Sequence, residues 1–268
     1  KTKVQVPLGF TSQSISLGQR SAMFVIFPYK DDNQAKSFPY LTWVIIAANL
    51  WVFFAWQFSL PPSEQATYFS TFAFLPVTFF GQLSFEESGD VIWEWATVFT
   101  SMFSHGGIAH VLGNMLFLYL YGDNVEDAMG KVRFFLFYLT CGLVAAVSQG
   151  LVDPSSNIPM VGASGAISGV IAGYLLLYPR ANVRVFYWFI IFIGTVLVPA
   201  YLVLGIWIIE QILAFPTSMS EGGGIAVAAH LGGFAAGILL TPFFKKKNVK
   251  FFQAGRTRAF SRQARRIG

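Results

Sequence analysis

The stretch IAVAAHLGGFAAGILLTPFF, residues 225–244, is 20 residues long and contains no Lys, Arg, Asp or Glu. A helix of about 20 apolar residues is long enough to cross the hydrocarbon core of a lipid bilayer. One ionisable side chain, His230, nevertheless lies within it. Ionisable residues inside membrane helices are costly and are usually functional. This stretch therefore predicts a membrane-spanning helix that carries a functional group.

The composition of the whole chain is typical of a membrane protein. Hydrophobic residues make up 54% of the 268 residues and only 12% are charged, which is about half the charged share of a soluble domain. Residues 1–22 are polar to mixed and do not predict a cleavable signal peptide. The single cysteine, Cys141, excludes an internal disulfide.

Hydrophobic runs predict six membrane spans and an all-α polytopic fold. The spans cover about residues 40–60, 108–121, 134–151, 164–178, 185–213 and 225–244. We therefore expect a cytoplasmic arm over residues 1–39, a six-helix domain over residues 40–244 and a basic cytoplasmic tail over residues 245–268. The long first external loop is rich in aromatic residues, so we expect it to lie partly in the membrane.

The basic residues indicate one orientation in the membrane. All 18 Lys and Arg residues lie in the two terminal segments, the second-to-third connection and the fourth-to-fifth connection, and the three alternate connections contain none. Cytoplasmic loops collect Lys and Arg, so both termini are predicted to be cytoplasmic. Topology and contact with anionic lipid explain the basic tail. Because no nucleic-acid motif accompanies it, we do not expect nucleic acid as a partner.

Several polar side chains lie in or beside the predicted spans, namely His105, His110, Asn114, Ser164 and His230. Three of them, His110, Ser164 and His230, lie 13 to 16 residues before a charged residue at the cytoplasmic end of their span. At about 1.5 Å per residue this places them roughly 20 to 24 Å from that end. Three different helices therefore place a polar group at a similar depth, below the outer surface of the membrane.

Two of these spans also carry small residues at every fourth position, which lets helix backbones approach closely. The small residues are Gly165, Gly169 and Gly173 in the fourth span, and Ala229, Gly233 and Gly237 in the sixth. A serine hydroxyl and an imidazole are short, and a hydrogen bond between them requires such an approach. The pattern therefore favours contact between Ser164 and His230.

Each feature has a simpler explanation when it is taken alone. Ser164 and Asn114 are of types that often pack or bond neighbouring helices, and a membrane histidine also serves as a proton relay. A small transporter is therefore an alternative, although no internal repeat supports it. The soluble-hydrolase pattern Gly-x-Ser-x-Gly is absent because residue 166 is Ala. Three dispersed histidines and one cysteine predict no metal site, and nothing predicts a cofactor.

The residues in combination resemble the rhomboid family of intramembrane serine proteases. The resemblance rests on HGGIAHVLGN at residues 105–114, GASG at residues 162–165 and AHLGGFAAG at residues 229–237, and it covers about residues 23–244. The start FPYKDDN, residues 27–33, is similar to small bacterial members. The resemblance implies a six-helix bundle in the bacterial inner membrane.

The family's site residues match positions of this sequence. The resemblance implies that Ser164 is the nucleophile, that His230 is the general base, and that the side chains of His110 and Asn114 form an oxyanion hole with the backbone N–H of Ser164. No carboxylate lies at the depth of His230, and Glu210, the one acidic residue in a predicted span, is expected near the outer end of its helix. This predicts a Ser-His dyad with no third member.

Two positions depart from the family pattern. Many members have an aromatic residue four positions after the nucleophile, where it packs against the catalytic imidazole, and here that residue is Ser168. Another ring or a hydrogen bond is then needed to orient His230. Many members also have Trp-Arg in the first loop, where this chain has Trp95 and Ala96.

The resemblance implies endoproteolysis of transmembrane proteins near the outer face of the membrane. A substrate helix must unwind locally before attack because helical carbonyls are hydrogen-bonded, and the family implies a small residue at the cut. The fifth helix and residues 214–224 are candidate gates for substrate entry. The alternative is a catalytically inactive relative that binds membrane proteins for quality control.

Overall fold

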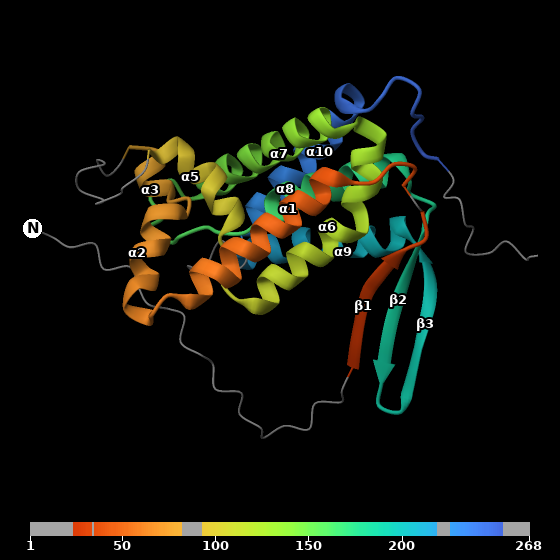
Figure 1. The fold of residues 1–268 in the computed structure, drawn as a ribbon, viewed down its shortest axis with the longest axis horizontal. Helices are drawn as coiled ribbons and strands as arrows, with labels where there is room; N and C mark the ends of the chain where they lie inside the picture. Colours follow the sequence, from red (N-terminus) through yellow and green to blue (C-terminus); the bar gives the residue numbers. More distant parts are fainter. Residues whose placement is uncertain (1–23, 34, 82–92, 219–225, 254–268) are drawn as a thin grey trace, which may run out of the picture.

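The computed structural model describes residues 24–33, 35–81, 93–218 and 226–253. A long helical bundle dominates it, and a small sheet projects from one end of the bundle (Figure 1). The helices at the predicted spans are α1 (Tyr40–Trp51), extended by η1 (Val52–Trp56) and η2 (Gln57–Ser59), then α6 (Ile108–Met129), α7 (Lys131–Val152), α8 (Ser164–Leu177), α9 (Ala200–Ser218) and α10 (Val227–Phe244). The short helices of the first long loop are α2 (Pro62–Phe72), α3 (Pro76–Phe79), α5 (Glu94–Thr100) and η3 (Ser101–Phe103).

In the part of the chain that the structure describes, four helices are long and apolar enough to cross a membrane by length and composition. They are Tyr40–Ser59, Lys131–Val152, Ala200–Ser218 and Val227–Phe244. Of the other two helices at predicted spans, α8 is apolar but has only 14 residues. The remaining helix, α6, carries acidic residues in its last turns. The expectation of a polytopic membrane protein is confirmed, and the count of six crossings stays a prediction.

The expectation of an all-α fold is wrong. Strands β1 (Phe24–Asp31), β2 (Asn182–Phe189) and β3 (Phe192–Pro199) form an antiparallel sheet in the order β1-β2-β3. The span predicted over residues 185–213 is therefore a β-hairpin up to Pro199 and a helix only from Ala200. The hairpin is rich in β-branched and aromatic residues, which favour strands. Hydropathy alone does not separate such a strand from a helix.

The first strand falls inside the expected cytoplasmic arm, and polar contacts tie it to the bundle. The side-chain amide of Asn124, near the end of α6, donates to Asp31 Oδ2 at 2.9 Å and accepts from Asn33 Nδ2 at 2.8 Å. Arg184 of β2 forms an ion pair with Asp32 at 2.7 Å. The domain boundaries at residues 39 and 244 stay a prediction.

The start of α1 is capped by a side chain from α6. Pro39, at the N-cap position, makes no side-chain cap. The buried carboxylate of Glu126 instead accepts hydrogen bonds from the N–H groups of Leu41 and Thr42 at 3.1 and 2.8 Å. It satisfies N–H groups that have no acceptor within α1, and its charge is favourable at the positive end of the helix dipole. This contact fixes α1 against α6.

The helix α8 lies in the middle of the bundle, packed against α6, α7 and α10 (Figure 1). Most of its residues are buried, including every residue from Gly165 to Tyr174. A Cβ placed on Gly233 of α10 would overlap the carbonyl oxygen of Gly165, and one on Gly237 would overlap the backbone of Gly169. The close approach predicted from the small residues is therefore confirmed.

Candidate active site

Ser164 is the first residue of α8 and lies where an incoming loop turns into the helix. Gly162, two residues earlier, has a φ of +118°, a conformation that residues with side chains rarely adopt. Its N–H donates to the carbonyl of Ser101 at 2.9 Å, which ties the loop to η3. At the first helical position, the backbone N–H of Ser164 has no acceptor within the helix. No backbone carbonyl among the described residues accepts from it either, so this N–H can bind an anion.

The structure brings Ser164 and His230 together. The Nε2 atom of His230 lies 2.8 Å from the hydroxyl oxygen of Ser164, although the two residues are 66 positions apart. This distance is a normal hydrogen bond. The close packing of α8 on α10 makes the contact possible, because neither side chain is long. A nucleophile and a base within hydrogen-bond distance are the starting geometry for nucleophilic catalysis.

The other side of His230 is held by α9. Its Nδ1 atom lies 2.7 Å from Oε1 of Gln211, and its ring centroid lies 6.0 Å from that of Trp207 at an interplanar angle of 40°. Ser168 does not orient the ring, because its buried hydroxyl donates to the carbonyl of Ser164 at 2.7 Å. In many family members an aromatic residue at the position of Ser168 orients the imidazole. Here α9 holds the His230 ring instead, through the Trp207 ring and the Gln211 hydrogen bond.

His110 and Asn114 lie one turn apart on α6 and both face the loop before Ser164. A Cβ on Gly162 would lie 2.8 Å from Nε2 of His110 and 3.5 Å from Nδ2 of Asn114. The Nδ2 atom of Asn114 is buried, and it finds no acceptor within residues 24–33, 35–81, 93–218 and 226–253. A buried N–H group without an acceptor is costly. Asn114 therefore places an unused donor beside the segment that leads to Ser164.

His105, the third histidine, lies beside His110. Its ring is buried and its centroid lies 5.1 Å from that of His110. The side chain of Gln57 pairs with its backbone: the N–H of His105 donates to Oε1 of Gln57 at 2.9 Å, and Nε2 of Gln57 donates to the carbonyl of His105. This pairing fixes the loop that enters α6 and hence the position of His110.

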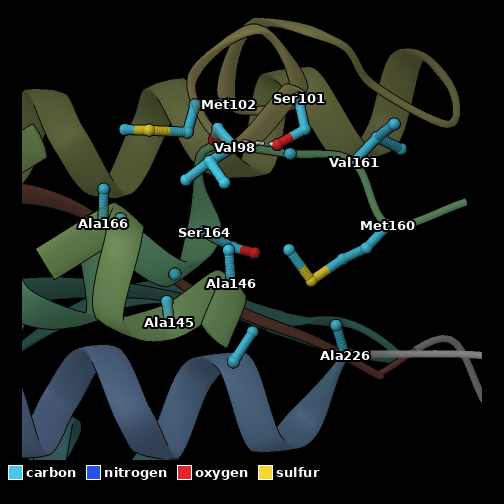
Figure 2. A pocket seen from close by; sticks show the side chains of 14 residues that line it. Val98, Ser101, Met102, Ala145, Ala146, Met160, Val161, Ser164, Ala166 and Ala226 are labelled. Atoms are coloured by element: carbon cyan, nitrogen blue, oxygen red, sulfur yellow. Dashed lines mark hydrogen bonds between the residues drawn. The ribbon is translucent and has the colours of Figure 1, made fainter. Parts of the chain in front are cut away.

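A small pocket borders the Ser164 hydroxyl, which points into it (Figure 2). Its volume is about 10 Å³, close to the minimum space that one water molecule needs. The lining side chains are mostly small or apolar and include Val98, Met102, Ala145, Ala146 and Met160. In this structure the pocket has room for a group about the size of one water molecule and no room for a large side chain.

Reasoning from the sequence missed three neutral groups around His230. They are Gln211 and Trp207 of α9, and Gln149 of α7, whose Oε1 accepts from the N–H of Ala229 at 3.2 Å and holds the start of α10. An amide inside an apolar span is the signal that could have identified Gln211 and Gln149. Glu210 is exposed, and it forms no ion pair with any residue that the structure describes.

The long apolar helices are those of a polytopic membrane protein, and comparison with known sequences gives the family. The sequence profile of the rhomboid domain matches residues 92–247. This match covers more than half of the chain, and the protein belongs to the rhomboid family.

Curated relatives agree with this family. YdcA of Bacillus subtilis (strain 168) is 28% identical over 208 residues, which cover 77% of this chain and 88% of YdcA. The mitochondrial RHOMBOID-like protein 12 of Arabidopsis thaliana is 31% identical over 58% of this chain and 48% of its own length. The rhomboid protease GluP of Bacillus subtilis is 33% identical over 54% of this chain. The match spans only 25% of GluP.

Proposed function

We propose that this protein is an intramembrane serine endopeptidase that cleaves transmembrane protein substrates, with Ser164 as nucleophile and His230 as general base. The observation that carries the proposal is the 2.8 Å contact between His230 Nε2 and Ser164 Oγ. The buried Asn114 amide places an unused hydrogen-bond donor near this contact. A serine-histidine hydrogen bond with only a structural role would not need such a donor.

The reaction begins with proton transfer from Ser164 to His230. The hydroxyl oxygen attacks the carbonyl carbon of the scissile peptide bond, and Nε2 of His230 takes the proton. The carbonyl oxygen becomes an oxyanion. The N–H of Ser164, the side chain of Asn114 and the ring of His110 stabilise it. His230 then gives the proton to the leaving amine, and an acyl-enzyme remains on Ser164.

The second half of the reaction reverses these roles with water. His230 takes a proton from a water molecule, whose oxygen attacks the acyl carbon. The oxyanion forms again in the same place and collapses, the carboxylic acid leaves, and the proton returns from His230 to Ser164. Both steps begin with a neutral His230, and neither step requires a buried carboxylate.

The pocket beside Ser164 favours a small residue at the cut. Its alanine-rich lining and volume of about 10 Å³ leave no room for a branched or aromatic side chain. A transmembrane substrate must also unwind at this point, because peptide groups within a helix are hydrogen-bonded internally. Substrate segments with small, poorly helix-forming residues meet both requirements.

In the proposed topology the chain crosses the membrane six times, with both termini in the cytoplasm and the site near the outer face. The absence of Lys and Arg from three alternate connections supports this topology. The short helices α2, α3 and α5 lie at the end of the bundle opposite the sheet (Figure 1). We place them at the outer interface and the sheet at the cytoplasmic side of a bacterial inner membrane.

Substrate entry is proposed to occur beside α9. Only 11% of the most apolar stretch of this helix is buried, the lowest share of the four long apolar helices. Little of its surface therefore packs against the rest of the bundle. Residues 219–224 of the second candidate gate lie outside the described residues. A crosslink between α9 and α6 that leaves cleavage intact would contradict entry at this position.

Reconstitution tests the proposed activity. The purified protein is placed in liposomes with a single-span substrate, and the wild type is compared with Ser164→Ala and His230→Ala. We expect cleavage by the wild type only, and labelling of Ser164 by a fluorophosphonate that is lost in Ser164→Ala. Equal cleavage by all three proteins would contradict the mechanism. Substrate capture without cleavage or labelling would favour the inactive binding protein.

A further inference from the structure

We infer that Gln211 is a positioning residue that fixes the tautomer and the ring orientation of His230. This inference rests on the proposed function, since it gives a role to Gln211 only if His230 is the base. It adds a third, uncharged member to the expected dyad. The observation is the 2.7 Å distance between Gln211 Oε1 and His230 Nδ1.

A histidine base must present a lone pair to the group that it deprotonates. Neutral imidazole carries one proton, and the hydrogen bond made by one nitrogen decides which nitrogen holds it. An amide oxygen only accepts hydrogen bonds. With Oε1 of Gln211 facing Nδ1, the proton lies on Nδ1. The Nε2 atom is then unprotonated and accepts from the Ser164 hydroxyl at 2.8 Å.

The inward face of α9 holds Gln211 in this place. Leu204, Trp207 and Gln211 follow one another at spacings of three and four residues, and therefore lie on one side of the helix. Leu204 is fully buried, and the Trp207 ring contacts both His230 and Phe234, with centroid distances of 6.0 and 6.4 Å. Packing at these two positions sets the rotation of α9, and that rotation aims the Gln211 amide at the imidazole.

A neutral partner suits a site inside a membrane. A carboxylate beside Nδ1 would place a charge in an apolar region, and burial of a charge is far more costly than burial of an amide. The carboxylate next to Gln211 in the sequence, Glu210, is exposed. Because the Ser168 hydroxyl donates to a backbone carbonyl and not to the ring, the partner of Nδ1 comes from α9.

The first test is kinetic and uses the reconstituted full-length protein. Gln211→Met keeps the size of the side chain and removes its strong acceptor. We expect kcat to fall roughly 10- to 100-fold, the loss that follows removal of the hydrogen-bonding partner of a metal-bound histidine. KM should not change, because Gln211 does not line the substrate pocket. Gln211→Glu restores an acceptor oxygen and should recover part of kcat, and Glu210→Gln is the matched control with wild-type kinetics.

The second test reads the tautomer directly and does not depend on proteolysis. The chain has three histidines, so ¹⁵N-histidine spectra of the protein in liposomes can be assigned with His230→Ala. We expect a protonated Nδ1 at His230 in the wild type, and a mixed or reversed tautomer in Gln211→Met.

The outcomes separate this inference from the proposed function. Unchanged kcat and an unchanged tautomer in Gln211→Met, with cleavage still abolished by Ser164→Ala, would overturn the role of Gln211 and leave the protease. A wild-type tautomer with the proton on Nε2 would also overturn it. A protonated Nδ1 without any cleavage or labelling by the wild type would instead contradict the proposed function.

Discussion

Gly233 of α10 lies so close to the carbonyl oxygen of Gly165 in α8 that a single added methyl group would overlap it. The oxygen belongs to the backbone and cannot turn away as a flexible side chain would. Gly165 is next to Ser164 and Gly233 is one turn after His230. The glycine contact therefore sets the spacing of the two helices on which the 2.8 Å Ser-His contact depends.

We expect Gly233→Ala to push α10 away from α8 and to abolish cleavage. Overpacking of a close contact costs about 1 to 3 kcal/mol, so the thermal midpoint should fall as well. Gly205→Ala in α9 is the matched control, because nothing lies within 4 Å of its added Cβ. Alanine is the better helix former by about 1 kcal/mol, so this control should keep or raise the midpoint. Full activity in Gly233→Ala would contradict this account.

Replacement of Asn114 by leucine is expected to separate activity from stability. The buried Nδ2 atom has no acceptor among the described residues, so an apolar side chain of similar size should leave the thermal midpoint unchanged or higher. Loss of one oxyanion donor should lower kcat by about 100- to 1,000-fold. Both quantities are measured on the same liposome preparation.

The matched control for this change is Asn124→Leu, on the same helix. Asn124 bonds Asp31, Asn33 and Asp123, so its loss should lower the thermal midpoint and affect kcat much less. A large fall in stability of Asn114→Leu would show that Asn114 is a structural residue.

Proximity of Ser164 and His230 could be predicted from the sequence because it follows from regular helices. A fixed rise per residue gives the depth of each polar group, and the spacing of small residues gives the face on which two helices meet. Both rules hold for α8 and α10, whose bounds lie within two residues of the expected ones. The close approach of Gly233 to Gly165 is the physical reason that the prediction succeeded.

The role proposed for Gln211 could not be predicted from the sequence, because α9 begins at Ala200 and not at residue 185, where the fifth span was expected to begin. Residues 185–199 are as apolar as a membrane helix, and only the pairing of β2 with β1 and β3 shows that they are strands. With the fifth span started at residue 185, the inward face of α9 could not be assigned. The sequence predicted no third member because no carboxylate was expected near His230, whereas an amide supplies the same kind of acceptor without a charge.

The stability of the sheet end is expected to depend on pH through Asp31, which lies outside the membrane spans. Burial raises the pKa of this carboxyl from 3.8 to about 7. Between these values the folded protein holds a proton that the unfolded chain has lost, so the free energy of unfolding falls as the pH rises from about 4 to about 7. Asp31→Asn cannot titrate.

The measurement is the thermal midpoint of wild type and Asp31→Asn between pH 4 and pH 8. The variant loses the carboxylate that accepts from Asn124, so its midpoint is expected to be lower overall. The two proteins are therefore compared by the slope of the thermal midpoint against pH, and this slope should be smaller in the variant. Equal slopes would contradict a buried carboxyl that gains its proton on folding.

Gly162→Ala is expected to disable the oxyanion donors without touching Ser164 or His230. The residue has a φ of +118°, which is strained for alanine, and its added Cβ would lie 2.8 Å from the ring of His110. The ring must then move from the loop, and kcat should fall by about 100-fold or more. Gly113→Ala, with open space around its Cβ, is the control on the same helix as His110. A variant with normal kcat would show that the position of His110 does not matter for catalysis.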